Sequence, residues 1–130
     1  MKEALMMILG ILASSGVLAA DVPKNIQKEL KSQLQEKGST YVTVALNAPF
    51  DPNRENLSDA ELLQQVTDMA AVVSSFISRM IESGKFDADD FHVMEGALAP
   101  IFTAELTRRN YQFLISDSMV LYYAPLIRSD

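Results

Sequence analysis

The feature that most constrains this chain is the stretch between residues 41 and 84, which predicts a β-strand, a turn and one long helix. Residues 41–47 alternate apolar side chains with small or polar ones, which is the period of a strand that buries one face. Pro49 and Pro52 follow closely, and neither can donate a backbone hydrogen bond to a sheet. The strand is therefore expected to end in a turn before the helix begins.

The helix after this turn has clear start and stop signals. Ser58 is followed three residues later by Glu61, the spacing of a capping box in which each side chain accepts from the other residue's backbone N–H. Gly84 supplies the kind of residue that often ends a helix. Between them, apolar residues recur at helical spacing: Leu62, Val66, Met69, Val73, Phe76, Ile77 and Met80. The pattern predicts an amphipathic helix with one buried side.

The remainder of the chain predicts three more strands and a second helix. Residues 91–98 and 101–107 read as strands joined in a hairpin, residues 108–117 as a short helix capped by Thr107, and residues 119–124 as a last strand. The order β-α-β-β-α-β predicts an α+β, ferredoxin-like domain over residues 39–124. In that architecture two helices cover one face of a four-stranded antiparallel sheet.

Residues 1–20 have the pattern of a secretory signal peptide. Lys2 precedes a continuous apolar run, and small residues near Ala20 offer a cleavage site. An uncleaved membrane anchor is the alternative, although the run is short and interrupted for a span. We expect cleavage, a periplasmic or secreted protein, and no stable membrane insertion afterwards.

Residues 21–38 predict a separate N-terminal helical extension, which Asp21 caps and Gly38 ends. Its apolar residues, Ile26, Leu30 and Leu34, form a single narrow stripe among lysines. Because such a stripe buries little, we interpret the segment as a solvated lead-in helix. The alternatives are that it lies on the domain or binds a partner.

Composition excludes several classes of function. A chain of 130 residues without cysteine holds one modest core and neither a disulfide nor a thiolate metal site. A net charge of −6 disfavours nucleic acid as a partner. The acidic run that begins at Asp87 fails as a calcium-binding EF-hand loop, because His92 and Leu98 occupy its glycine and glutamate positions. We therefore predict no metal and no cofactor.

An enzymatic function has weak support in the sequence. His92 is the only histidine, so any Ser-His-Asp triad must use it, and no Gly-x-Ser-x-Gly motif lies near it. We interpret His92 as a surface residue, structural or pH-sensitive, and Arg108 and Arg109 as a solvated pair. The prediction is that the protein is not an enzyme.

The last strand predicts an apolar surface on the sheet. Val120 and Tyr122 are expected to point to one side, and Leu121 and Tyr123 to the other. Because two helices cover only one face, the opposite face is expected to be open and to bind a partner. Cover by the N-terminal helix or by a second copy is the alternative.

Three stretches in order resemble the propeptide-like domains that precede bacterial subtilisin-type serine proteases. Residues 42–52, Val-Thr-Val-Ala-Leu-Asn-Ala-Pro-Phe-Asp-Pro, lead into the capped helix as they do in that family. Residues 97–107 look like its central hairpin, and residues 114–126 like its closing helix and strand. The resemblance covers about residues 40 to 127, and the helix over residues 21–38 has no counterpart in it.

The resemblance implies binding of a subtilisin-type serine protease in trans, because no protease sequence follows Asp130. In that family the free sheet face packs on two helices of the enzyme. The C-terminal tail, here residues 125–130, enters the substrate cleft by β-augmentation. Inhibition and assisted folding of the protease are both open. An acidic side chain, Glu95 or Glu105, is expected to cap the helices of the enzyme. The candidate protease-binding residues are Tyr123, Ala124, Pro125, Leu126, Ile127, Arg128, Ser129, Asp130 and Glu95.

The rival function is a ferredoxin-like periplasmic sensory or dimerisation module that binds a small molecule or a protein. A glycine-rich loop or a convergent set of polar residues favours such a module, and the sequence shows neither.

Overall fold

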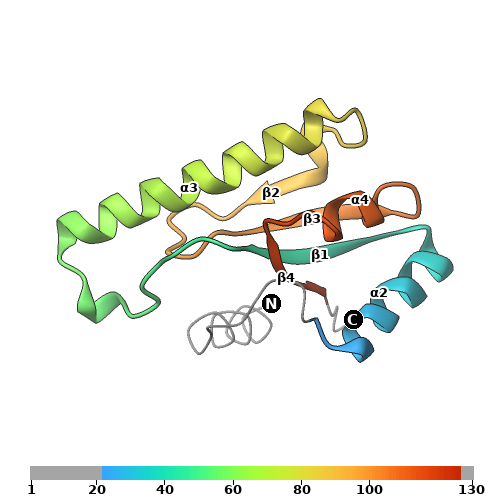
Figure 1. Cartoon of the computed structure of the whole chain (residues 1–130), viewed down its shortest axis with the longest axis horizontal. Helices are drawn as coiled ribbons and strands as arrows, with labels where there is room; N and C mark the ends of the chain where they lie inside the picture. Colours follow the sequence, from blue (N-terminus) through green and yellow to red (C-terminus); the bar gives the residue numbers. More distant parts are fainter. Residues whose placement is uncertain (1–21, 127–130) are drawn as a thin grey trace.

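The computed structural model describes residues 22–126, and Figure 1 shows the whole chain. The predicted signal peptide, the Asp21 cap and the tail residues 127–130 lie outside the described residues. Among residues 22–126, no helix is both long enough and apolar enough to cross a membrane.

Four antiparallel strands form one open sheet. They are β1 (Ser39–Leu46), β2 (Phe91–Val93), β3 (Ile101–Thr107) and β4 (Val120–Pro125). Their order across the sheet is β2-β3-β1-β4, so β1 and β3 are central and β2 and β4 are the edges. The predicted α+β class and the four-stranded antiparallel sheet are confirmed.

Three α-helices accompany the sheet in the described residues: α2 (Lys24–Lys37), α3 (Asp59–Glu82) and α4 (Tyr111–Ile115). The capping box at the start of α3 is confirmed, since Ser58 Oγ accepts from Glu61 N at 3.2 Å and Glu61 Oε1 accepts from Ser58 N at 3.0 Å. The hydrogen bonds from the Ser58 backbone and side chain lower the pKa of the Glu61 carboxyl. Gly84, with φ of 80°, follows the end of α3 in the left-handed conformation.

The hairpin and the last helix differ from prediction. β2 has only three residues, because the chain leaves the sheet after Val93 and residues 94–100 form a longer connection than expected. α4 starts after Asn110, so Thr107 is not its cap. Instead, the buried Asn110 side chain accepts from Thr107 N at 2.8 Å and donates to Lys85 O at 3.2 Å. These bonds stabilise the turn over residues 108–110, so α4 begins three residues later than predicted.

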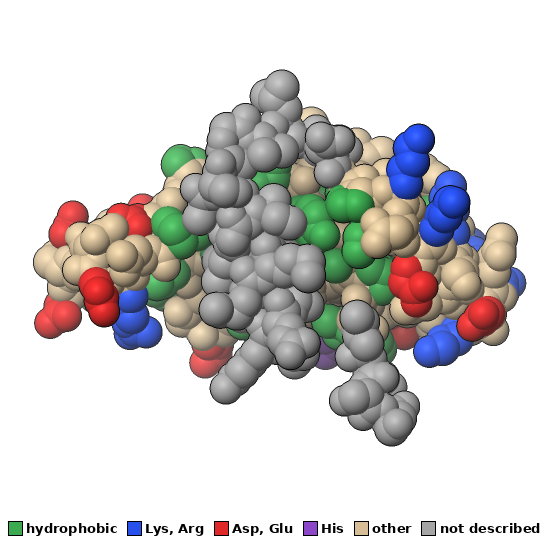
Figure 2. All heavy atoms as spheres, turned by 90° about the horizontal axis from the view of Figure 1, so that it is seen from below, with side chains coloured by type: hydrophobic (Ala, Val, Ile, Leu, Met, Phe, Trp, Pro, Cys, Tyr) green, Lys and Arg blue, Asp and Glu red, His purple; other side chains and the backbone are tan. Residues whose placement is uncertain are grey.

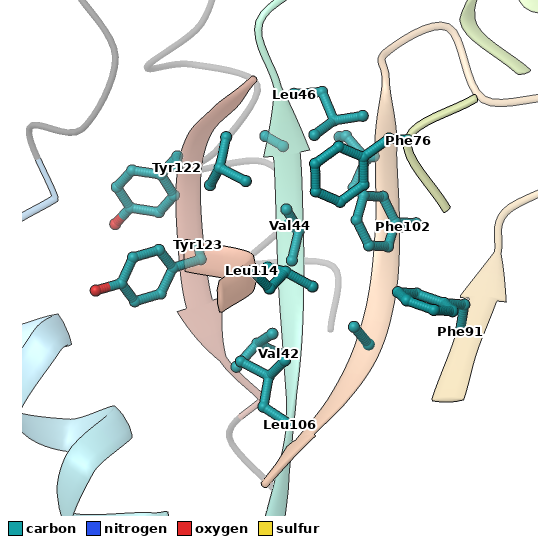
Figure 3. Close-up of a cluster of buried hydrophobic side chains, with 14 of the residues drawn as sticks. Val42, Val44, Leu46, Phe76, Phe91, Phe102, Leu106, Leu114, Tyr122 and Tyr123 are labelled. Carbon is teal, nitrogen blue, oxygen red and sulfur yellow. The ribbon is translucent and has the colours of Figure 1, made fainter. Parts of the chain in front are cut away.

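One hydrophobic core lies between the sheet and the helices (Figure 3). The ring of Phe76 on α3 lies 5.5 Å, between centroids, from the ring of Phe102 on β3. Phe102 faces Val44 across the β1–β3 pair, and Leu114 of α4 is buried in the same cluster. The predicted apolar side of α3 therefore packs on the sheet face that carries Val44 and Phe102.

The α2 helix belongs to this core, so the interpretation of a solvated lead-in helix is wrong. Leu30 and Leu34 are only 1% and 2% exposed. Arg108 also holds the end of the helix, since its Nε donates to Leu34 O at 2.9 Å and its guanidinium donates to Gln35 O. A cation at the C-terminal carbonyls is favourable to the helix dipole. The narrow apolar stripe is enough to attach α2 to the domain because Arg108 also fixes the end of the helix. The expectation that Arg108 is simply solvated is therefore wrong.

The side chains of β4 do not alternate as predicted. Tyr123 pairs with Val44 and Tyr122 with Ala45, but the register then shifts, and Leu46 pairs with Val120. The shift leaves Leu121 without a partner in the ladder, as in a β-bulge. Val120 therefore lies on the same side as Tyr123 rather than with Tyr122.

Gln65, near the start of α3, joins two long loops. The Gln65 side-chain amide donates to Asp51 O at 2.9 Å and to Leu98 O at 3.0 Å, and its oxygen accepts from Asp51 N at 3.1 Å. These three bonds tie the β1–α3 connection to the β2–β3 connection. The Gln65 side chain thus satisfies backbone groups that have no strand partner, because both segments are irregular here.

Candidate functional site

The sheet face opposite Val44 and Phe102 carries a polar and aromatic surface. Tyr41 on β1 faces Glu105 on β3, and His92 on β2 faces Thr103 on β3. The rings of Tyr41 and His92 lie 6.3 Å apart between centroids, across β3. His92 is exposed and the other three are partly exposed. We call Tyr41, His92, Thr103 and Glu105 the sheet surface.

This sheet surface differs from the apolar face that the sequence predicts. Tyr122 and Leu121, of which one was expected to lie on the open face, are only 4% and 7% exposed. Ile101, which pairs with Ala45 on β1, is buried as well. The expectation of an open apolar face at β4 is therefore wrong. The accessible part of the sheet face carries polar side chains that are able to form hydrogen bonds, and two rings in contact.

The two candidate acidic residues lie in different places. Glu105 is part of β3 and of the sheet surface, half-buried beside Tyr41. Glu95 is exposed in the connection between β2 and β3, where it lines a shallow apolar groove with Val93 and Met94 of the same segment. The structure therefore does not bring Glu95 together with the other candidate residues.

The end of β4 brings together the described members of the predicted tail site. Ala124 is partly exposed opposite Thr43, and Tyr123 is buried on the other side. β4 ends at Pro125, and one further backbone bond follows it, from Leu126 N to Tyr41 O at 2.9 Å. The chain therefore stays on the sheet one residue longer. Ile127, Arg128, Ser129 and Asp130 lie outside the described residues.

Burial affects the ionisation of the two tyrosines of β4. It raises the pKa of the Tyr122 hydroxyl, and it raises the pKa of Tyr123, to which the neighbouring Tyr111 adds. Both hydroxyls are therefore neutral O–H donors at physiological pH. Tyr123 accordingly contributes to the interior next to α2, and the protease-facing role expected for it does not match its burial.

Charge is distributed unevenly over the molecule. Figure 2 shows Asp and Glu side chains gathered at its left end, which Figure 1 identifies as the region around the start of α3. Most Lys and Arg side chains in this view lie at the opposite end, around α2, and hydrophobic side chains lie between the two ends. In the described part of the chain, no group of three His, Asp or Glu side chains is placed to hold a metal ion.

Sequence reasoning missed Tyr41 and Thr103 as surface residues. The signal was present, since both alternate with core positions: Tyr41 precedes Val42, and Thr103 follows Phe102. What the sequence does not contain is the pairing that places Tyr41 and His92 on two strands either side of β3. Their proximity follows from the strand order together with the pairing register.

Comparison of the chain with models of known protein families, with curated proteins and with solved structures finds no match. The function is accordingly inferred from the residues and from their arrangement.

Proposed function

We propose that this protein is exported, binds a subtilisin-type serine protease in trans, as inhibitor or folding chaperone, and has the ferredoxin-like fold of the propeptides it resembles. The element order β1-α3-β2-β3-α4-β4 supports that fold. Read from the other edge, the strand order is β4-β1-β3-β2, so each helix connects two strands separated by one antiparallel strand. This arrangement supports the proposed split βαβ pattern, with α2 as an addition.

The observation that carries the proposal is the position of β4. It is an edge strand, and the last residues of the sequence follow it directly. The final described backbone bond, from Leu126 N to Tyr41 O, fixes the point from which residues 127–130 continue. Four residues at ~3.3 Å each reach roughly 13 Å, enough to occupy several subsites of a protease cleft as an added strand.

The sheet surface supports the same function in a revised form. Glu105 presents a carboxylate from a rigid strand, beside Tyr41, whereas Glu95 lies in a loop away from this face. A fixed carboxylate is suited to accept from the free N–H groups at the start of a helix of the partner. In this proposal Glu105 is the capping acid, and Tyr41 and His92 supply ring contacts around it.

Inhibition of subtilisin tests the proposal directly. The full chain is compared with a variant that lacks residues 127–130, using release of p-nitroaniline from a peptide substrate. We expect the full chain to inhibit and the truncated chain to lose at least about tenfold in affinity, with a melting temperature within about 2 °C. Refolding yield of denatured subtilisin is measured in parallel, because a chaperone and an inhibitor share the same contacts. Equal activity of both chains in both assays would refute a working tail.

Two matched acidic variants test the sheet surface. Glu105→Gln removes the charge on the strand, and Glu95→Gln removes a charge in the loop. A lost interaction with a helix N-terminus corresponds to an increase of about three- to tenfold in the inhibition constant. We expect that increase for Glu105→Gln alone. The same result for both variants would show that only the net charge of the chain matters.

A further inference from the structure

A pocket lies outside the surface described above, between α2, α4 and β4. Its volume is about 250 Å³, and it is partly open to solvent. The residues that line it come from three elements that are distant in sequence: Val22, Gln27, Leu30, Lys31, Tyr111, Gln112, Ile115, Ser116, Val120 and Tyr123. Arg108 bonds to the last turn of α2, the helix that forms one wall of the pocket. None of these residues except Tyr123 belongs to the candidate protease-binding set.

The size and the floor of the pocket favour one small ring. A cavity of about 150 Å³ lined by aliphatic side chains accommodates benzene in other proteins, so about 250 Å³ accommodates a ring with a short polar group. The apolar lining comes from Leu30, Ile115 and Val120, of which Leu30 and Val120 are buried. Figure 3 shows the Tyr123 ring projecting from β4 away from β1, on the side where α2 lies.

The polar lining includes two tyrosine hydroxyls that can donate hydrogen bonds. The Tyr111 hydroxyl accepts from Gln112 Nε2 at 3.2 Å, which leaves its own O–H available to donate. Burial raises the pKa of the Tyr123 hydroxyl, so that group also remains a donor. The two tyrosine hydroxyls can therefore donate to a ligand that accepts hydrogen bonds.

The charge of the lining is positive. Lys31 is its one charged residue, and the lining includes no Asp or Glu. Lys24 and Lys28 precede Lys31 by seven and three positions, which places all three lysines along one side of α2. Although the whole chain has a net charge of −6, the side of α2 that borders this pocket therefore carries positive charges.

We propose that this pocket binds a small aromatic carboxylate, with the ring against Leu30, Ile115 and Val120 and the carboxylate toward Lys31 and the two tyrosine hydroxyls. The inference is independent of the proposed protease binding. The proposed ligand site lies on the opposite side of β4 from Ala124.

Benzoate and its neutral analogue benzamide test the site in the full chain. Binding is followed by two-dimensional NMR of the backbone amides. We expect benzoate to shift the amides of Ile115, Val120 and Tyr123 in a saturable way, with a dissociation constant on the order of 1 mM, as suits a ligand of about nine non-hydrogen atoms. Benzamide is expected to bind at least about fivefold more weakly, because it lacks the charge.

Two lysine variants separate the local charge from the general charge of α2. Lys31→Met removes the charge in the lining, and Lys37→Met removes one from the last turn of the same helix, outside the lining. Lys31→Met should abolish the preference for benzoate over benzamide, and Lys37→Met should preserve it. A third variant, Ser116→Phe, fills the exposed rim and should weaken both ligands, with thermal melting to verify that each variant folds. Absence of saturation by about 10 mM benzoate, or equal losses in Lys31→Met and Lys37→Met, would overturn the proposal.

Discussion

Replacing Arg108 by methionine should weaken the attachment of α2 and lower the stability of the whole domain. Arg108 is exposed, yet its guanidinium donates to two carbonyls in the last turn of α2, those of Leu34 and Gln35. Methionine keeps the aliphatic stem but removes the charge and the donors. The matched control is Arg109→Met, which changes the adjacent exposed arginine of the same turn.

The magnitude follows from what remains after the substitution. Leu34 O still accepts from Gly38 N at 2.8 Å, and water can reach Gln35 because that residue is exposed. No buried polar group is left unpaired, so the cost is the net value of two charge-assisted bonds and the dipole contact, about 1–2 kcal/mol. If α2 detached completely, the loss of Leu30 and Leu34 from the core would cost several times more, since each truncation alone costs about 2–5 kcal/mol.

Thermal unfolding followed by circular dichroism measures this effect. For a domain of this size, about 1–2 kcal/mol corresponds to a decrease of roughly 4–8 °C in melting temperature. Arg109→Met should change the melting temperature by about 1 °C or less. Equal shifts in the two variants would refute the argument that Arg108 fixes α2.

Three further perturbations follow from the same structure. Gln65→Ala removes three bonds between two loops and should cost about 2–3 kcal/mol in urea unfolding, whereas its exposed neighbour Gln64→Ala should cost about 0.5 kcal/mol or less; similar values would contradict the loop-joining role. Ser58→Ala removes half of the capping box and should cost about 1 kcal/mol, and an unchanged urea midpoint would count against it. Burial raises the pKa of Asp117, but hydrogen bonds from Arg79 and a backbone N–H outweigh it, so the folded-state pKa is lowered and stability falls as the pH drops below about 5. Urea midpoints of Asp117→Asn should approach those of the wild type toward pH ~2, and a constant difference would argue against that linkage.

Local signals in the sequence were sufficient for the elements with strong patterns. The capping box of Ser58 and Glu61, the apolar period of α3 and the left-handed Gly84 all act within a few residues of one another. The alternation in β1 predicted the burial of Val42, Val44 and Leu46, although Thr43 and Ala45 on its other face are buried as well. These features need no distant partner, because capping, helix period and strand period are properties of neighbouring residues.

The weaker elements depended on contacts that the sequence does not reveal. β2 was predicted to span residues 91–98, but it has only three residues. Residues 94–98 leave the sheet, and the Leu98 carbonyl accepts from the Gln65 side chain instead of from a strand. α4 was predicted to begin at Arg108, but that side chain bonds to α2, and Asn110 sets the start of the helix.

Tertiary structure alone decided which surfaces are open. A single extra residue in β4, Leu121, reversed the sidedness of Val120, because in a strand each shift by one residue turns the side chain to the other face. The strand order placed Tyr41 and His92 on either side of β3, and α2 closed one side of the pocket at Lys31. The sequence determined the local conformations, whereas the candidate sites arise where segments separated by tens of residues meet, and only packing brings them together.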